Sequence, residues 1–115
     1  MLEKLLYTLV FSISLTVLVS CTKQAESKAL ASSVEAQFMS SDKEIGKMLD
    51  DLNNQNVPLQ RKREILCKTY PEVYKKQYMP SLLKLSPKVY TEETLLRDFE
   101  AVISFYKKTF VVNCG

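Results

Sequence analysis

The sequence predicts an all-α protein: a compact domain of three or four short, crossed helices that follows a signal peptide and a flexible tether. Apolar residues recur at three- and four-residue steps along most of residues 41–110, and residue types that begin and end helices lie where these steps start and stop. No alternation of apolar and polar residues, as in a strand, occurs before Val111. The connections are short and contain prolines, which favours crossed packing over long parallel coils.

The first twenty residues have the composition of a signal peptide. Residues 5–19 carry no charge, and as a helix they would be about 22 Å long, which is short for the roughly 30 Å hydrocarbon core of a membrane. Lys4 supplies a positive charge before this stretch, and a polar segment follows it. We therefore expect residues 1–20 to be removed after export. An uncleaved helical anchor and ordinary secretion remain open as alternatives.

The apolar stretch ends in Leu18-Val19-Ser20-Cys21. This resembles the lipobox of bacterial lipoproteins: an aliphatic residue three positions before a cysteine, a small residue directly before it, and the cysteine itself. The resemblance implies cleavage before Cys21, a diacylglycerol on its sulfur and an acyl chain on its amine, which together hold a protein stably at a membrane. It also implies the outer membrane in a cell with two membranes, because Thr22 is not the aspartate associated with inner-membrane retention.

The mature chain is expected to begin with a tether at residues 21–40 and to continue as a helical domain at residues 41–115. The tether is rich in Ser, Ala and Lys. A capping box, Ser41 with Glu44 three residues later, predicts the start of the first helix. Its apolar face is Ile45, Met48, Leu49 and Leu52. The run Asn53 to Asn56 ends it.

Prolines divide the next stretch. Pro58 suits the start of a second helix, with Leu59, Leu66, Cys67 and Tyr70 on one stripe and Arg61, Lys62 and Lys68 off it. Pro71 either ends this helix or opens the next one. The third helix runs to about Ser86, with Val73, Tyr74, Tyr78, Leu82 and Leu85 on its buried side. Pro80 removes one helical hydrogen bond, so we expect a kink or break at Tyr78–Met79.

The last helix has the clearest boundaries. Thr91 can cap it, Glu92 and Glu93 lie at its positive end, and Lys107 and Lys108 lie at its negative end. Its apolar face is Leu95, Leu96, Phe99, Val102, Ile103, Tyr106 and Phe110. Glu93 and Arg97 are spaced as a surface ion pair.

Two cysteines remain after Cys21 is lipidated, and an even pair in an oxidising compartment predicts one disulfide, Cys67–Cys114. It would tie the C-terminus to the middle of the chain. The chain-entropy model gives such a closure roughly 4 kcal/mol. We expect a staple and not a redox site, since there is no C-x-x-C motif.

The composition argues against an enzyme. Histidine is absent, and only two glycines occur, so neither a histidine-based site nor a phosphate-binding loop can form. Adjacent acids occur as Asp50-Asp51 and Glu92-Glu93. The two side chains of each pair point about 100° apart around a helix, so they do not converge as a catalytic carboxylate dyad. The run after Asp51 lacks the glycine and glutamate of a calcium loop. We therefore predict no catalytic residue, no metal site and no cofactor.

The middle of the chain is basic and rich in tyrosine. Residues 59–90 carry eight Lys or Arg and two acids, for a net charge of +6. We expect an anionic lipid surface or an acidic protein as partner and no nucleic acid outside the cytoplasm; a solvated face is the alternative. The candidate partner-binding surface is Arg63, Tyr70, Tyr74, Lys75 and Tyr78. Burial of the tyrosine rings in the core is the alternative.

These observations predict a lipid-anchored, non-catalytic envelope protein that binds or inhibits another envelope protein. Residues 67–91, CKTYPEVYKKQYMPSLLKLSPKVYT, resemble small envelope lipoproteins of no named activity. In size, cysteine use and address the chain is similar to immunity and exclusion lipoproteins. The alternative is a periplasmic carrier or sensor of a small apolar ligand or lipid. Orientation at the membrane and oligomeric state are not predicted.

Overall fold

The predicted all-α architecture is confirmed. The computed structural model describes residues 18–115, with side chains from residue 32 onward, and these residues form helices and no strand. The helices are α2 (Leu18–Asn53), α3 (Leu59–Glu64), η1 (Ile65–Thr69), α4 (Tyr70–Val73), η2 (Tyr74–Tyr78), α5 (Met79–Leu85) and α6 (Glu92–Phe110). Val34–Gly115 is one compact unit, separate from the preceding part of the chain, and it contains the described hydrophobic core and the disulfide. No helix in the described part is long and apolar enough to cross a membrane.

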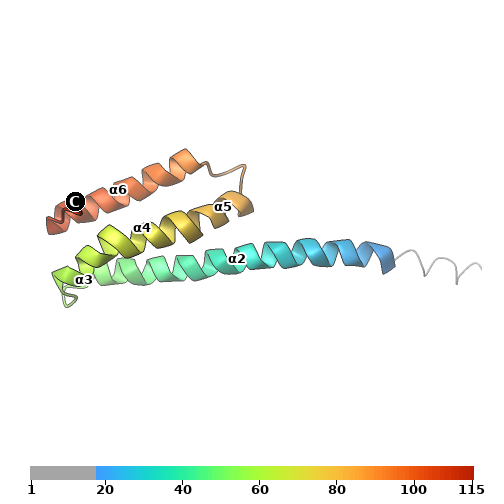
Figure 1. Ribbon diagram of the computed structural model, residues 1–115, viewed down its shortest axis with the longest axis horizontal. Coiled ribbons are helices and arrows are strands. Elements are labelled where there is room, and N and C mark those ends of the chain that lie inside the picture. The colour runs from blue at the N-terminus through green and yellow to red at the C-terminus, as the bar shows by residue number, and fades with distance from the viewer. Residues whose placement is uncertain (1–17) are drawn as a thin grey trace, which may run out of the picture. The chain divides into compact units, whose positions relative to one another are not determined.

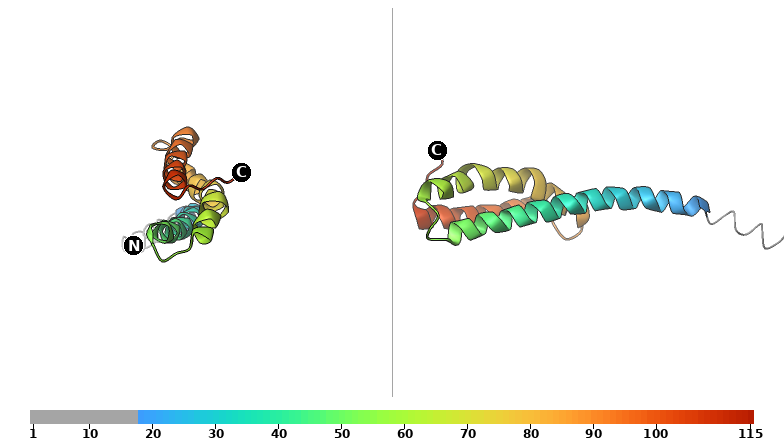
Figure 2. Two further views of the ribbon diagram at one scale, coloured as in Figure 1. Left: turned by 90° about the vertical axis from the view of Figure 1, so that its left-hand side faces the viewer. Right: turned by 90° about the horizontal axis from the view of Figure 1, so that it is seen from below.

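Three helical rods form this compact unit: the C-terminal half of α2, the continuous run from α3 to α5, and α6 (Figure 1). Seen nearly along the helices, they occupy separate corners (Figure 2, left). Each pair is joined by side-chain contacts, for example between Phe38 and Tyr78 and between Tyr74 and Phe99. The core they enclose is Ile45, Met48, Leu52, Ile65, Leu66, Tyr70, Val73, Tyr74, Met79, Leu82, Leu95, Phe99, Ile103 and Val112. It contains most of the predicted apolar faces, but Leu59 and Leu85 are exposed.

The prediction that a helix begins at Ser41 is wrong. Helix α2 is already continuous there, and the Ser41 hydroxyl donates to the carbonyl oxygens of Gln37, at 2.9 Å, and Phe38, at 3.0 Å. Ser41 is fully buried. A serine inside a helix can satisfy its hydroxyl in this way, and Phe38 carries the apolar face of α2 one turn before Ser41.

Pro71 and Pro80 lie at the starts of α4 and α5, and neither interrupts the helical rod. No break occurs at Tyr78–Met79, where the rod changes from π-helix to α-helix. Each proline lies two residues after a five-residue π-helical segment, η1 or η2. The amides that close these segments, those of Tyr70 and Met79, donate to the carbonyl oxygens of Ile65 and Tyr74, five residues back. Proline has no N–H and its ring presses on the carbonyl one turn earlier. A wider π turn relieves that clash, and the helix continues.

The predicted disulfide is confirmed. Cys67 of η1 and Cys114, beyond the end of α6, are bonded across 47 residues of sequence, with Cα atoms 5.4 Å apart. Cys67 is half-buried and Cys114 is exposed, so the bond lies at the edge of the core. It fixes the C-terminal tail against the middle helical rod.

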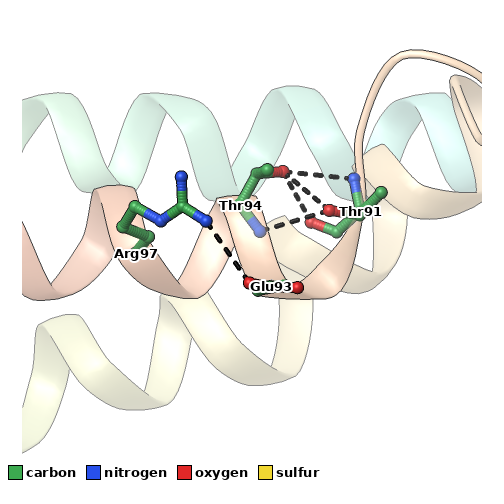
Figure 3. Close-up of polar contacts among 4 residues, drawn as sticks. All are labelled: Thr91, Glu93, Thr94 and Arg97. Carbon is green, nitrogen blue, oxygen red and sulfur yellow. Dashed lines mark hydrogen bonds and ion pairs between the residues drawn. The ribbon is translucent and has the colours of Figure 1, made fainter.

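Helix α6 has the predicted boundaries. The Thr91 hydroxyl accepts from the Thr94 amide at 3.2 Å, and the Thr94 hydroxyl accepts from the Thr91 amide at 3.3 Å (Figure 3). Thr94 therefore completes a capping box, a role usually taken by Glu or Gln. The ion pair between Glu93 and Arg97 forms at 3.4 Å on the surface (Figure 3). At the other end Val111 adopts a left-handed conformation, with φ 54°.

Candidate functional site

Three tyrosines of the middle rod form a row along its buried side. Tyr70, Tyr74 and Tyr78 follow one another at four-residue steps, with neighbouring ring centroids 6.0 Å and 5.2 Å apart. In an α-helix such a row drifts around the axis by about 40° per step, whereas the wider π turn drifts the other way. The first step crosses α4 and the second crosses η2, so the two drifts offset each other. The π-helical segment η2 thus keeps the three rings on one face.

The row packs against Phe99 of α6. Its ring lies 5.4 Å from that of Tyr70, nearly parallel at 12°, and 4.9 Å from that of Tyr74. On the other side the ring of Phe38 in α2 lies 5.5 Å from that of Tyr78. Offset and tilted ring pairs at these separations attract one another. The cluster therefore joins all three rods.

The Tyr74 hydroxyl donates to the carbonyl oxygen of Leu95 at 2.7 Å within the core. Burial, reinforced by nearby phenols and by Asp98, raises the pKa of Tyr74 to about 12. Burial likewise raises the pKa of Tyr70 to about 12, and that of Tyr78 upward, with Asp42 as the next contribution for Tyr78. All three rings are therefore neutral at physiological pH.

A groove of about 210 Å³ opens beside this row. It is lined by Tyr70, Tyr74, Tyr78, Leu82, Tyr90, Leu95, Asp98, Phe99 and Val102. Tyr90 comes from the loop before α6 and is half-buried, while Asp98 is exposed. Among the described residues, Asp98 has no ion-pair partner and the hydroxyls of Tyr70, Tyr78 and Tyr90 have no hydrogen-bond partner in the protein. The groove thus combines aromatic side chains with one carboxylate that has no ion-pair partner and three hydroxyls that have no hydrogen-bond partner among the described residues.

The structure brings together four of the five residues of the predicted partner-binding surface. Tyr70, Tyr74 and Tyr78 line the groove, and Tyr70 and Tyr74 also belong to the core, as the alternative interpretation expected. That these tyrosines bind a partner stays a prediction. Lys75 places its ammonium 5.1 Å from the centroid of the Phe99 ring, which borders the groove. Arg63 is exposed on α3 and does not line the groove.

Two groove residues lie outside the predicted partner-binding surface: Tyr90, which the sequence offers only as a further tyrosine, and Asp98, which sequence reasoning missed. Tyr90 lies directly before the helix cap at Thr91, and Asp98 directly precedes the core residue Phe99. The sequence indicated only that Tyr90 lies at the start of the last helix and that Asp98 lies beside its apolar face. Only the packing of α6 against the middle rod reveals that they meet the tyrosine row.

Lys62 is also not where the sequence placed it. It was expected off the apolar stripe, but it is buried, with 7% of its surface exposed, and its ammonium lies 4.4 Å from the centroid of the Phe110 ring. The aliphatic part of a lysine can cover apolar surface while its charge stays near an aromatic face. The other basic residues of the middle rod, namely Arg61, Arg63, Lys68, Lys75, Lys76 and Lys84, are exposed.

A larger hollow, of about 490 Å³, lies between α2 and the start of the middle rod. Its lining mixes charges of both signs, including Lys43, Glu44, Lys47, Asp51 and Arg61. No group of three or more Cys, Asp or Glu residues in the described part of the chain is arranged to hold a metal ion.

The predicted signal peptide and lipidation site remain predictions. Residues 1–17 lie outside those described, and the described side chains begin after Cys21, whose backbone lies in α2. Comparison with known proteins finds no matching family model, no matching curated protein and no matching solved structure.

Proposed function

We propose that this chain is a lipid-anchored, non-catalytic protein of the bacterial envelope that binds, and thereby inhibits or captures, another envelope protein. Lipid attached to Cys21 anchors it, it is located at the outer membrane, and its folded part faces the periplasm or the cell surface. The disulfide between Cys67 and Cys114 supports export, because structural disulfides form and persist in oxidising compartments.

The tyrosine-lined groove is the observation that carries the binding role. Its volume of about 210 Å³ is below the range of roughly 300–1,000 Å³ typical of sites that enclose a small molecule. A groove of this size suits one inserted side chain. Tyrosine is enriched at the energetic centres of protein interfaces, where it combines a large apolar ring with a polar end.

The exposed basic residues support the same role. Of the six on the middle rod, only Arg61 forms an ion pair among the described residues, with Glu64 at 3.5 Å. Unpaired charges on the rod that carries the groove can steer a partner that has an acidic patch. We therefore propose that acidic residues of the partner meet this rod while one of its side chains enters the groove.

Site-specific photo-cross-linking in intact envelopes tests this function. A photoreactive phenylalanine analogue at Tyr90 stands at the groove, and the same analogue at Glu100 stands on the exposed side of α6, outside it. We expect a discrete adduct with one envelope protein from the Tyr90 position and not from the Glu100 position. Equal adducts from both positions, or none from Tyr90, would contradict a protein-binding groove. Lipid recovered with the native protein by mass spectrometry would instead support a carrier.

A further inference from the structure

The tyrosine-lined groove has the chemistry of a site for a guanidinium group. Its aromatic lining consists of the tyrosine row, Phe99 and Tyr90, of which Tyr78 and Tyr90 are half-buried and the others buried. A planar cation stacks favourably on an accessible aromatic ring. The protein already uses this interaction nearby, since the Lys75 ammonium stands over the Phe99 ring at 5.1 Å. Lys62 does the same over Phe110 at 4.4 Å.

The groove also supplies acceptors for the N–H groups of a guanidinium. Asp98 lines it, is exposed, and has no ion-pair partner among the described residues, because Arg97 beside it binds Glu93. A carboxylate and a guanidinium match each other through two parallel hydrogen bonds. The hydroxyls of Tyr78 and Tyr90 are without protein partners in the described part of the chain and offer two further oxygens.

The charge at the groove favours a cation over an anion. The first turns of α6, from Glu92 to Glu100, contain four acidic residues and only one basic residue, Arg97. Burial is the main cause that raises the pKa of Tyr74 and of Tyr78, and Asp98 and Asp42 add to it. Asp98, which lines the groove, would attract an incoming cation against the repulsion of the Lys75 ammonium over the Phe99 ring.

We infer that the groove receives an arginine side chain of the partner protein, with its guanidinium against the half-buried rings of Tyr78 and Tyr90 and bound to Asp98. This deepens the proposed function and rests on it only for the source of the arginine. Arginine fits better than lysine because its planar fork matches both the carboxylate and the ring faces, whereas an ammonium is a compact point charge.

An NMR titration of the full-length chain in detergent tests the recognition directly. The probe is N-acetyl-argininamide, and its neutral isostere N-acetyl-citrullinamide has nearly the same shape without the charge. We expect the arginine probe to shift the signals of Tyr90 and Asp98 and to bind about three- to fivefold more tightly than the citrulline probe. Equal affinity for both probes, tighter binding of N-acetyl-lysinamide, or no shift at the groove would overturn the inference.

Matched variants separate a specific contact from overall charge. Asp98→Asn and Glu100→Gln each remove one negative charge from exposed positions on α6, but only Asp98 lines the groove. We expect Asp98→Asn to abolish the preference for arginine over citrulline and Glu100→Gln to preserve it. Equal effects of the two substitutions would overturn the inference.

The two proposals fail in different ways. If the Tyr90 cross-link forms in the envelope but the arginine probe does not bind, the arginine inference falls and the protein-binding function stands. If the probe binds as expected but no Tyr90 adduct forms, the guanidinium site stands and the protein-binding function falls.

Discussion

Tyr74 donates its phenolic hydrogen to the backbone oxygen of Leu95, at 2.7 Å and 21 residues away in sequence. The bond joins the second π turn of the middle rod to the first turns of α6, beneath the groove. It ties the tyrosine row to α6 one turn before Phe99. The same contact therefore serves the core and the shape of the proposed binding site.

We expect Tyr74→Phe to lower the free energy of unfolding by about 1 kcal/mol, since it removes one buried hydrogen bond and keeps the ring. Tyr78→Phe is the matched control, because the Tyr78 hydroxyl has no hydrogen-bond partner among the described residues, and its effect should be close to zero. Urea unfolding measures both. Equal losses in the two variants would show that the Leu95 contact contributes nothing specific.

The raised pKa values of Tyr70 and Tyr74 predict a loss of stability at high pH. Both are raised to about 12 in the folded protein, from 10. The folded state therefore keeps its phenolic protons to higher pH than the unfolded state. This stability is complete below about pH 10 and is lost as the pH rises from about 10 to about 12. Urea unfolding at several pH values, beside a phenolate absorbance titration, checks it. A free energy of unfolding that stays constant across this range would refute the prediction.

Val111 is a strained position that a glycine would relieve. Its φ of 54° is unfavourable for a β-branched residue. Its turn places the amide of Val112 2.9 Å from the carbonyl oxygen of Lys107 and buries the Val112 side chain. We expect Val111→Gly to raise the free energy of unfolding by about 0.5–1 kcal/mol, after allowing for the greater freedom of glycine in the unfolded chain.

Val89→Gly is the control for this substitution. Val89 is also an exposed loop valine, at 74% against 87% for Val111, but its φ is not positive. Thermal unfolding should show a lower stability for Val89→Gly and a higher one for Val111→Gly. Stabilisation by both, or by neither, would contradict the strain assigned to Val111.

The disulfide should contribute a large share of the stability of this small domain. Replacing both Cys67 and Cys114 by serine is expected to lower the free energy of unfolding by roughly 4 kcal/mol. A reducing agent should destabilise the unaltered protein by a similar amount and leave the double variant unchanged. If reduction has no effect on unfolding, the bond is not closed in the protein as isolated.

Local and compositional features of the fold were predictable, and long-range ones were not. Thr91, the charged ends of α6 and the pairing of Cys67 with Cys114 follow from residue types and from simple counting, and they are confirmed. The helix start predicted at Ser41 was wrong. Ser41 with Glu44 three residues later has the pattern of a capping box, but the Ser41 hydroxyl donates to the carbonyl oxygen of Gln37 within a helix that began earlier. The preference of Ser41 for a helix start was overridden because Phe38, one turn earlier, packs against the core and keeps the helix continuous.

The prolines show a second limit. A proline inside a helix usually breaks or kinks it, and this rule was applied to Pro71 and Pro80. A π turn before each proline instead lets the helix continue. No residue pattern distinguishes a broken helix from one that continues through a π turn. The groove was likewise only partly predictable from the sequence. Its tyrosine row is visible in sequence at four-residue steps, whereas Asp98 joins it only through the way α6 packs.

Metabolic labelling with palmitate tests the central claim, that a lipid at Cys21 anchors this protein in the envelope. The comparison is between the unaltered chain, Cys21→Ser, and Cys67→Ser as a control for cysteine loss elsewhere. We expect label and membrane association for the unaltered chain and for Cys67→Ser, and neither for Cys21→Ser. An unlabelled native chain whose mobility is unchanged by Cys21→Ser would contradict it.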